Sequence, residues 1–288
     1  MTADMSAFSS RLHFFGDLTF LTAHRIGAEQ SQAVDAPKLP ILRTMDGLPY
    51  IPGSSFKGAW RSYTESILRT LQAQPGLIDN LACLPLAEKE RCLTPDVIRR
   101  IKNGAGAGAS QEQSIVDTRL RDASCWTCRV FGNGQLAAKV LVKDLYIDPA
   151  RYFQTEIRDG VAIDRDSGRA KGGQLYQFET VPAGAAFSLE ILVENATPAE
   201  CGLVMLGLNA FMRGEVLLGG AKSRGLGWCK LEPKWKQSEY VTTNDPDDLL
   251  TYLFRPADVK PVGLTGQESE AWVSAFREAI QVKEGKDA

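Results

Sequence analysis

Four of the six cysteines in this sequence fall into two groups that together can bind a metal ion. The first group is Cys83 and Cys92, and the second is the CWTC segment with Cys125 and Cys128. Four thiolates hold Zn²⁺ in a tetrahedron, and a Cys-x-x-Cys pair is a common half of such a site. A redox pair or four unrelated thiols are the alternatives, but no thioredoxin-like pattern surrounds CWTC. The sequence therefore predicts a structural zinc site.

The segment GLPYIPGSSFKGAWRS, residues 47–62, joins two turns, a helix start and a basic face. Ser54 or Ser55 is predicted to cap the helix, and Lys57 and Arg61 lie one turn apart along it. Backbone N–H groups, serine hydroxyls and two cations at a helix start suit phosphate groups. An ordinary capped amphipathic helix without a ligand is the alternative.

A second basic segment, GGAKSRGLG at residues 219–227, places four glycines around Lys222, Ser223 and Arg224. Glycines let a backbone approach a ligand closely, and exposed N–H groups can form an anion-binding concavity. The GxxxxGK[ST] order of a P-loop is absent, so the segment does not predict a nucleotide triphosphate site.

These two segments together resemble signatures of the RAMP superfamily, in particular the palm-and-thumb backbone subunit of type III CRISPR interference complexes. A third segment, GVAIDRDSGRAKGGQLYQFETVPAGAAF at residues 160–187, is similar to the thumb hairpin and return strand of that subunit. The resemblance extends from the first predicted strand to Leu231. It implies binding of CRISPR guide RNA and of target single-stranded RNA, beside other subunits of the effector complex, including RAMP paralogues.

The resemblance also places Asp35, in QAVDAPKLPI, at the position of the family's catalytic aspartate. RNA cleavage by the ribose 2′-hydroxyl needs a group that takes a proton or holds a metal. The implied activity is a metal-dependent endoribonuclease that uses Mg²⁺ or Mn²⁺. The alternative is a catalytically silent backbone subunit that only coats the guide RNA, with Asp35 an ordinary turn residue. A guide-processing enzyme fits less well, because such enzymes rely on histidine and this chain has only His13 and His24.

The resemblance further implies that side chains near the loop, the helix start, the hairpin and the glycine-rich segment contact RNA. Contacts to phosphates position any sequence and specify none. A solvated hairpin with charges of mixed sign is the alternative for the third segment. The predicted RNA-binding residues are His24, Arg25, Arg43, Ser54, Ser55, Lys57, Arg61, Arg165, Arg169, Lys171, Lys222, Ser223 and Arg224.

Hydrophobic periodicity supplies the elements that position these residues. Strands are predicted over residues 11–24, with a bulge at Gly16, and over 139–147, 186–194 and 227–232, with helices from Phe56 and over 198–214. The order strand, helix, strand, strand, helix, strand predicts an α+β fold: a ferredoxin-like or RRM-like βαββαβ palm with a cysteine-bearing insertion and a β-hairpin thumb.

The predicted fold divides the chain into six successive parts. They are the first part of the palm with its active-site loop (1–75, loop 24–47), the cysteine-bearing zinc insertion (76–130), palm (131–154), thumb hairpin (155–182), palm with the glycine-rich loop (183–233) and a C-terminal tail (234–288). The tail is predicted to be polar and then helical from Glu268.

Composition limits the classes of function. The 288 residues are 44% hydrophobic and 24% charged, with a formal net charge of −2. This balance excludes a free-standing, strongly basic nucleic-acid binder, although local basic stripes can still carry phosphate contacts. No apolar run reaches the length of a membrane span, and MTADMSAFSS lacks a signal-peptide core, so we expect no membrane partner and a cytoplasmic location.

Overall fold

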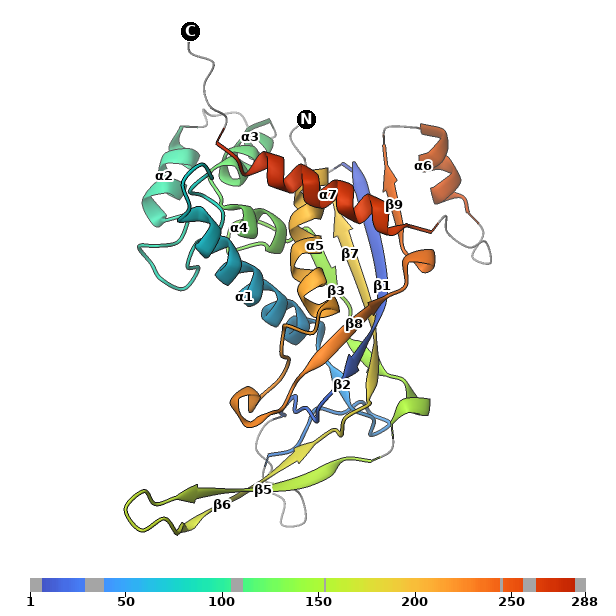
Figure 1. The fold of residues 1–288 in the computed structure, drawn as a ribbon. Coiled ribbons are helices and arrows are strands. Elements are labelled where there is room, and N and C mark those ends of the chain that lie inside the picture. The colour runs from blue at the N-terminus through green and yellow to red at the C-terminus, as the bar shows by residue number, and fades with distance from the viewer. Residues whose placement is uncertain are drawn as a thin grey trace.

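The computed structural model describes residues 7–28, 39–104, 111–152, 154–243, 246–255 and 263–282. The strands are β1 (Ser10–Phe20), β2 (Tyr50–Ile51), β3 (Val140–Val142), β4 (Leu145–Ile147), β5 (Glu156–Ile163), β6 (Ala170–Thr180), β7 (Ala186–Glu194), β8 (Cys229–Pro233) and β9 (Glu239–Thr242). The α-helices are α1 (Gly53–Gln72), α2 (Pro95–Asn103), α3 (Gln111–Asp122), α4 (Trp126–Phe131), α5 (Pro198–Met212), α6 (Pro246–Leu253) and α7 (Gly266–Ala279). The chain therefore has the predicted α+β composition, with helices beside a sheet and a projecting hairpin (Figure 1).

The sheet is built around β1, whose residues alternate between buried and half-buried positions. Every second side chain of a strand points to the same face, so Leu12, Phe14 and Leu18 enter the core together. The order of the strands is β2-β4-β7-β1-β8, with β3 also paired to β7 and β9 to β1, and all these pairs are antiparallel. The succession β1, α1, β3 with β4, β7, α5 and β8 is compatible with the predicted βαββαβ order.

Helix α5 lies against the sheet and carries the C-terminal helix α7 on its outer side (Figure 1). Thr197 and Glu200 form a capping box that satisfies the first backbone N–H groups of α5. Gly202 lets α7 approach closely, because a Cβ at this position would lie 2.1 Å from the carbonyl oxygen of Trp272. The predicted helical tail therefore packs onto the core, but β9 and α6 were not predicted.

Three details of the predicted elements are wrong. β1 ends at Phe20, and its pairing with β7 runs through Gly16 without a bulge. Glycine is required there because a Cβ would lie 2.7 Å from Leu231 Cδ1. The predicted strand 139–147 is two short strands, since the chain between β3 and β4 turns to bring Asp144 to the start of α1.

The residues between α1 and β3 contain more helix than the sequence analysis predicted. α2 begins with Thr94, whose hydroxyl accepts a hydrogen bond from the backbone N–H of Val97, and α3 and α4 follow. A small hydrophobic cluster of Leu93, Leu120 and Leu136 lies apart from the main core. Residues 105–110, which hold most of the predicted GAGAGAS linker, lie outside the described ranges.

The predicted hairpin is formed by β5 and β6, which pair only with each other among the described strands. It projects from the lower end of the palm in Figure 1. Gly160 faces Tyr176 on the neighbouring strand, and a Cβ on Gly160 would lie 2.2 Å from the tyrosine ring. The glycine therefore makes room for the tyrosine ring to lie across the hairpin.

A buried ion pair joins the residue before β3 to α5. Lys139 Nζ lies 2.6 Å from Glu200 Oε2 and donates a second hydrogen bond, of 2.7 Å, to the carbonyl oxygen of Asn195. The two side chains are 1% and 7% exposed. Burial lowers the pKa of Lys139, while the carboxylate of Glu200 opposes that change.

None of the helices in the described part of the chain combines the length and apolar character that crossing a membrane requires.

Candidate nucleic-acid interface and metal centre

The four predicted cysteine ligands come together at the edge of the insertion. The sulfur atoms of Cys83, Cys92, Cys125 and Cys128 all lie within 4.8 Å of one another. Cys125 is the N-cap of α4 and Cys128 lies one turn into that helix, which explains how the Cys-x-x-Cys spacing turns both thiols to one side. The chain therefore contains a four-cysteine cluster that can hold a metal ion.

Four hydrogen bonds hold the first cysteine segment against α4 and α1. Thr127 donates from its backbone N–H and its hydroxyl to the carbonyl oxygen of Leu81, at 3.1 Å in both cases. The side-chain oxygen of Gln72, at the end of α1, accepts from the backbone N–H groups of Leu81 and Ala82. Cys83 follows directly, so its position is set by the helices on either side.

The dimensions of the cluster fit zinc. A tetrahedral ion with Zn–S bonds of about 2.3 Å separates its sulfur ligands by roughly 3.8 Å. The sulfur atoms of Cys83 and Cys128 are 3.7 Å apart. Hydrogen bonds from Cys125 and Cys128 lower the pKa of the Cys83 thiol to about 7, and those from Cys125, Cys128 and Cys83 lower the pKa of Cys92. Hydrogen bonds within the cluster and burial instead raise the pKa values of Cys125 and Cys128, so without a cation the four thiols share their protons. Deprotonated thiols are the form that binds metal.

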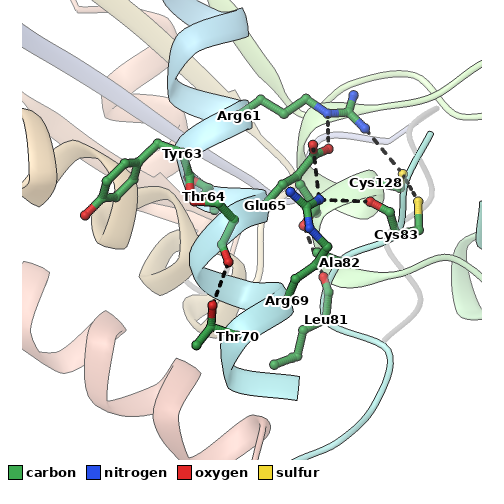
Figure 2. A network of polar contacts seen from close by, with 12 residues as sticks. Arg61, Tyr63, Thr64, Glu65, Arg69, Thr70, Leu81, Ala82, Cys83 and Cys128 are labelled. Carbon is green, nitrogen blue, oxygen red and sulfur yellow. Dashed lines mark hydrogen bonds and ion pairs between the residues drawn. The ribbon is translucent and has the colours of Figure 1, made fainter. Parts of the chain in front are cut away.

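Arg61 and Arg69 of α1 reach the cluster from one side (Figure 2). Arg61 Nη2 lies 3.5 Å from Cys128 Sγ, and Arg69 Nη1 lies 3.4 Å from the carbonyl oxygen of Cys83. Glu65, between them, is 2.7 Å from Arg61 Nε and 3.8 Å from Arg69 Nη1. Burial alone would lower the pKa of Arg61, but Glu65 and Cys128 raise it overall.

The described ends of the predicted active-site loop meet at the base of the hairpin. Gly27 and Ile41 form an antiparallel bridge, which brings residues 28 and 39–40 together. His24 forms a bridge to Val181, and Leu39 forms one to Phe178. Asp35 itself falls in residues 29–38, outside the described ranges, so its predicted catalytic role stays a prediction.

Glu179 joins these loop ends to the hairpin and was not predicted. One carboxylate oxygen accepts from the Thr155 hydroxyl at 2.7 Å and pairs with Arg43, and the other accepts from the backbone N–H of Ile41 at 3.1 Å. Burial alone would raise the pKa of Glu179, but these hydrogen bonds lower it overall. Arg43 is thus held at the loop end, with its guanidinium also bonded to the carbonyl oxygen of Gly47. No local sequence pattern indicates this contact.

The glycine-rich segment packs beside the same loop. The backbone N–H of Gly220 donates to the carbonyl oxygen of Arg25 at 2.8 Å, and a Cβ on Gly219 would lie 2.5 Å from that oxygen. Lys222, Ser223 and Arg224 form an exposed 3-10 turn. The guanidinium of Arg25 lies near Gly220, since a Cβ there would be 3.8 Å from Arg25 Nη1.

Arg224 connects the glycine-rich segment to the hairpin. Its guanidinium hydrogen-bonds the hydroxyl of Tyr176, and Arg224 Cζ lies 5.6 Å from the centre of that ring. Tyr176 in turn stacks with Phe178. The glycine-rich segment therefore contacts Arg25 through its first glycines and the hairpin through Arg224.

His24 was predicted to contact RNA but is buried, with 1% of its surface exposed. Its ring stacks on Phe20 at a centroid distance of 3.5 Å and meets Phe187 edge-on at 5.3 Å. Burial lowers the pKa of His24 from 6.5 to about 3. The side chain is therefore part of the core and does not lie on the surface.

The pKa of His24 predicts a loss of stability in acid. Because the folded pKa lies below the unfolded one, the unfolded chain binds more protons as the pH falls from 6.5 towards 3. We expect this group to reduce the free energy of unfolding by about 2 kcal/mol between pH 7 and pH 5. Urea unfolding of the wild type and His24→Gln at both pH values measures the effect. An equal decrease in both proteins would contradict the assignment.

The residues at the start of α1 differ from the prediction in their contacts. Pro52 is the N-cap, so neither Ser54 nor Ser55 caps the helix, and Asp144 Oδ1 accepts from the backbone N–H of Gly53 at 2.8 Å. Lys57 donates to the carbonyl oxygen of Val140 at 2.8 Å. Ser54 is exposed, whereas Lys57 and Arg61 are half-buried in internal contacts. Contact of these residues with RNA stays a prediction.

The remaining predicted residues lie along the hairpin. Arg165 and Arg169 are exposed beside the turn that joins β5 to β6, away from the palm (Figure 1). Lys171 belongs to β6, and its side chain is outside the described part. The structure therefore separates the hairpin tip from the basic residues at the glycine-rich segment.

Two comparisons place these features among known proteins. A model described as the RAMP superfamily matches residues 17–230, which include α1, the cysteine cluster, the hairpin and the glycine-rich segment. The CRISPR system Cms endoribonuclease Csm3 of Methanocaldococcus jannaschii is 29% identical over 138 residues. That alignment covers 42% of this chain and 54% of the relative, so the chain spans about half the length of this curated relative.

Proposed function

This chain belongs to the RAMP superfamily, and from that premise we propose that it binds CRISPR guide RNA as a backbone subunit of a type III effector complex. The observation that carries the proposal is the exposed turn with Lys222 and Arg224, which lies inside the matched region and is held between Arg25 and the hairpin. Glycines allow a phosphate to approach the backbone, and the two cations balance its charge. Such contacts hold any sequence, so reading of the target is left to base pairing with the guide.

We propose that the palm and the hairpin have separate roles in binding the guide RNA. The palm binds guide phosphates through Ser54, Ser55 and the exposed turn at residues 222–224. The hairpin, with Arg165, Arg169 and Lys171, crosses the guide. Neighbouring subunits, including RAMP paralogues, complete the complex, and the target is a complementary single-stranded RNA. The name of the Methanocaldococcus jannaschii relative, a CRISPR endoribonuclease, supports this assignment.

The proposed reaction is cleavage of the bound target RNA, with Asp35 as the catalytic residue. Its carboxylate takes the proton of a ribose 2′-hydroxyl or provides an oxygen ligand to a cation. A divalent ion, Mg²⁺ or Mn²⁺, supplies a Lewis acid at the phosphate when it is bound. The closed ends of the loop at Gly27 and Ile41, beside Arg25 and Glu179, support a role for this segment next to the RNA.

For the insertion we propose a structural zinc ion on Cys83, Cys92, Cys125 and Cys128. The sulfur separations support tetrahedral binding, and four protein ligands leave no open position for a substrate. The small hydrophobic cluster beside the cysteines has only three buried members, so a metal adds the stability that apolar burial there does not supply.

Cleavage of a guide-complementary RNA by the assembled complex tests this function. The complex carries wild-type chain, Asp35→Ala or Asp46→Ala, and each is assayed with Mg²⁺ and with chelator. Asp46 is a matched control because it is an exposed aspartate near the end of the same loop. We expect specific cuts to vanish with Asp35→Ala and with chelator, while guide and target binding persist and Asp46→Ala cuts normally.

The silent-scaffold alternative gives a different result. If Asp35→Ala leaves the cuts unchanged, the chain only coats the guide and another subunit cleaves the target. If the assembled complex contains no guide RNA, the proposed binding function itself is wrong.

A further inference from the structure

The side chain of Arg61 reaches from helix α1 to the cysteine cluster, and its three guanidinium nitrogen atoms all contact acceptors. Nη2 is 3.5 Å from Cys128 Sγ, Nη1 donates to the carbonyl oxygen of Gly132 at 2.8 Å, and Nε donates to Glu65 at 2.7 Å. Its side chain is 22% exposed. Figure 2 shows the guanidinium above the two sulfur atoms of Cys83 and Cys128.

We infer that Arg61 is a positioning residue of the metal centre, which holds Cys128 in place and slows loss of the bound ion. The inference rests on the zinc site of the proposed function but needs no RNA contact. It assigns Arg61 a role different from the predicted phosphate contact.

Charge is the first reason. A zinc ion with four thiolates carries a net double negative charge, and Cys125 and Cys128 are buried. Placing such charge away from water is costly unless donors compensate it. A guanidinium cannot lose its proton in a protein and directs several N–H groups at once, so it suits this position better than a lysine does.

Geometry is the second reason. The carbonyl oxygen of Gly132 and the sulfur of Cys128 belong to the two ends of one turn of α4, where the backbone N–H of Gly132 donates to the Cys128 carbonyl oxygen. By contacting both, Arg61 fixes the rotation of that turn and hence the direction of the thiol. Partners in the shell around metal ligands commonly change metal affinity by about 10–100-fold when they are removed.

Glu65 makes the arrangement rigid and extends it to the other cysteine segment. Its carboxylate is 12% exposed and lies within reach of both Arg61 and Arg69. Arg69 contacts the carbonyl oxygen of Cys83. One carboxylate on α1 thus orients two arginines, and these arginines contact the two chain segments that the metal would join.

Release of zinc into excess chelator, followed with a colorimetric metal indicator, tests the inference on the purified full-length chain. The variants are Arg61→Gln, Arg61→Lys and Lys57→Gln. Lys57 is a matched control because it is a half-buried cation one turn earlier on α1 that bonds a backbone carbonyl away from the cysteines. We expect release from Arg61→Gln to be about 10–100-fold faster than from the wild type, with partial recovery in Arg61→Lys and no change in Lys57→Gln.

Thermal unfolding with and without metal separates positioning from a general structural role. Because Arg61 also contacts Glu65 and Gly132, Arg61→Gln lowers the Tm of the chelated form, but loss of a positioning residue should lower the Tm of the zinc-loaded form more. Lower stability of the chelated variant by the same amount as the loaded one would overturn the inference.

Three other results would also overturn it. The first is a rate of zinc release from Arg61→Gln equal to that of the wild type. The second is a rate of release from Lys57→Gln that rises as much as that from Arg61→Gln. The third is weaker guide-RNA binding by Arg61→Gln with a normal rate of zinc release. A chain that binds no zinc would overturn it as well, while leaving the RNA-cleavage test unaffected. Failure of cleavage with normal zinc behaviour would contradict only the proposed function.

Discussion

Replacing Cys128 with serine should strongly weaken zinc binding and loosen the insertion. Structural zinc contributes about 10–16 kcal/mol to the folding of isolated zinc-finger peptides, so losing one of four ligands at roughly 3 kcal/mol weakens binding more than about 100-fold. The cluster joins Cys83, Cys92 and the start of α4, which come from separate parts of the insertion. Zinc content by mass spectrometry and limited proteolysis of residues 76–130 measure the two effects.

Cys201→Ser is the matched control for that experiment. Cys201 is a fully buried thiol on α5, outside the cluster, so the variant tests the loss of a buried thiol without loss of a ligand. We expect it to keep its zinc and its resistance to proteolysis in the insertion. Normal zinc content in Cys128→Ser would show that the four thiols are not a metal site.

Lys139→Met should lower the free energy of unfolding by about 3–5 kcal/mol, because it leaves the Glu200 carboxylate buried without its cation. It also removes the donor to the carbonyl oxygen of Asn195. The lysine stem is replaced by an apolar chain of similar length, so packing changes little. Chemical denaturation at neutral pH measures the difference in unfolding free energy.

The double variant Lys139→Met with Glu200→Gln distinguishes an unpaired charge from lost packing. Glutamine keeps an oxygen for the capping contact with the backbone N–H of Thr197 but carries no charge. We therefore expect the double variant to recover much of the stability lost in Lys139→Met. A further decrease on adding Glu200→Gln would mean that the carboxylate is not the source of the loss.

The local hydrophobic pattern was sufficient to predict a helix or strand where one face of that element is buried. β7 was predicted at its observed bounds because Phe187, Leu189, Ile191 and Val193 alternate with polar residues along one buried face. α5 was predicted through its apolar content and ends within two residues of the predicted limit. In these elements burial and sequence period coincide.

Prediction failed where a distant contact sets the structure. The break between β3 and β4 depends on Asp144 reaching the backbone N–H of Gly53, a contact between residues 91 positions apart. The burial of His24 depends on Phe187, which lies far along the chain. α2, in contrast, carried a local signal that was overlooked: Thr94, Pro95 and Asp96 are a regular helix start.

The candidate site could be predicted only where its residues carry a local sequence signal. The four cysteines were identified because a thiol has few other uses at such spacing, and the structure brings them together. Glu179 and Tyr176 were missed because an isolated glutamate or tyrosine in a strand carries no positional signal. Arg61 was identified as a basic residue of α1, but its contact with Cys128 depends on how the insertion folds back.

The bridge between Gly27 and Ile41 makes the segment between them modular. The entropic cost of holding the two ends of a chain together grows with the logarithm of the chain's length, so doubling the length of such a segment costs only about 0.6 kcal/mol. The bridge therefore tolerates a change in the length of the segment between its two ends at a small entropic cost. The scaffold and this segment can diverge at different rates, and one palm can carry different segments in different subunits.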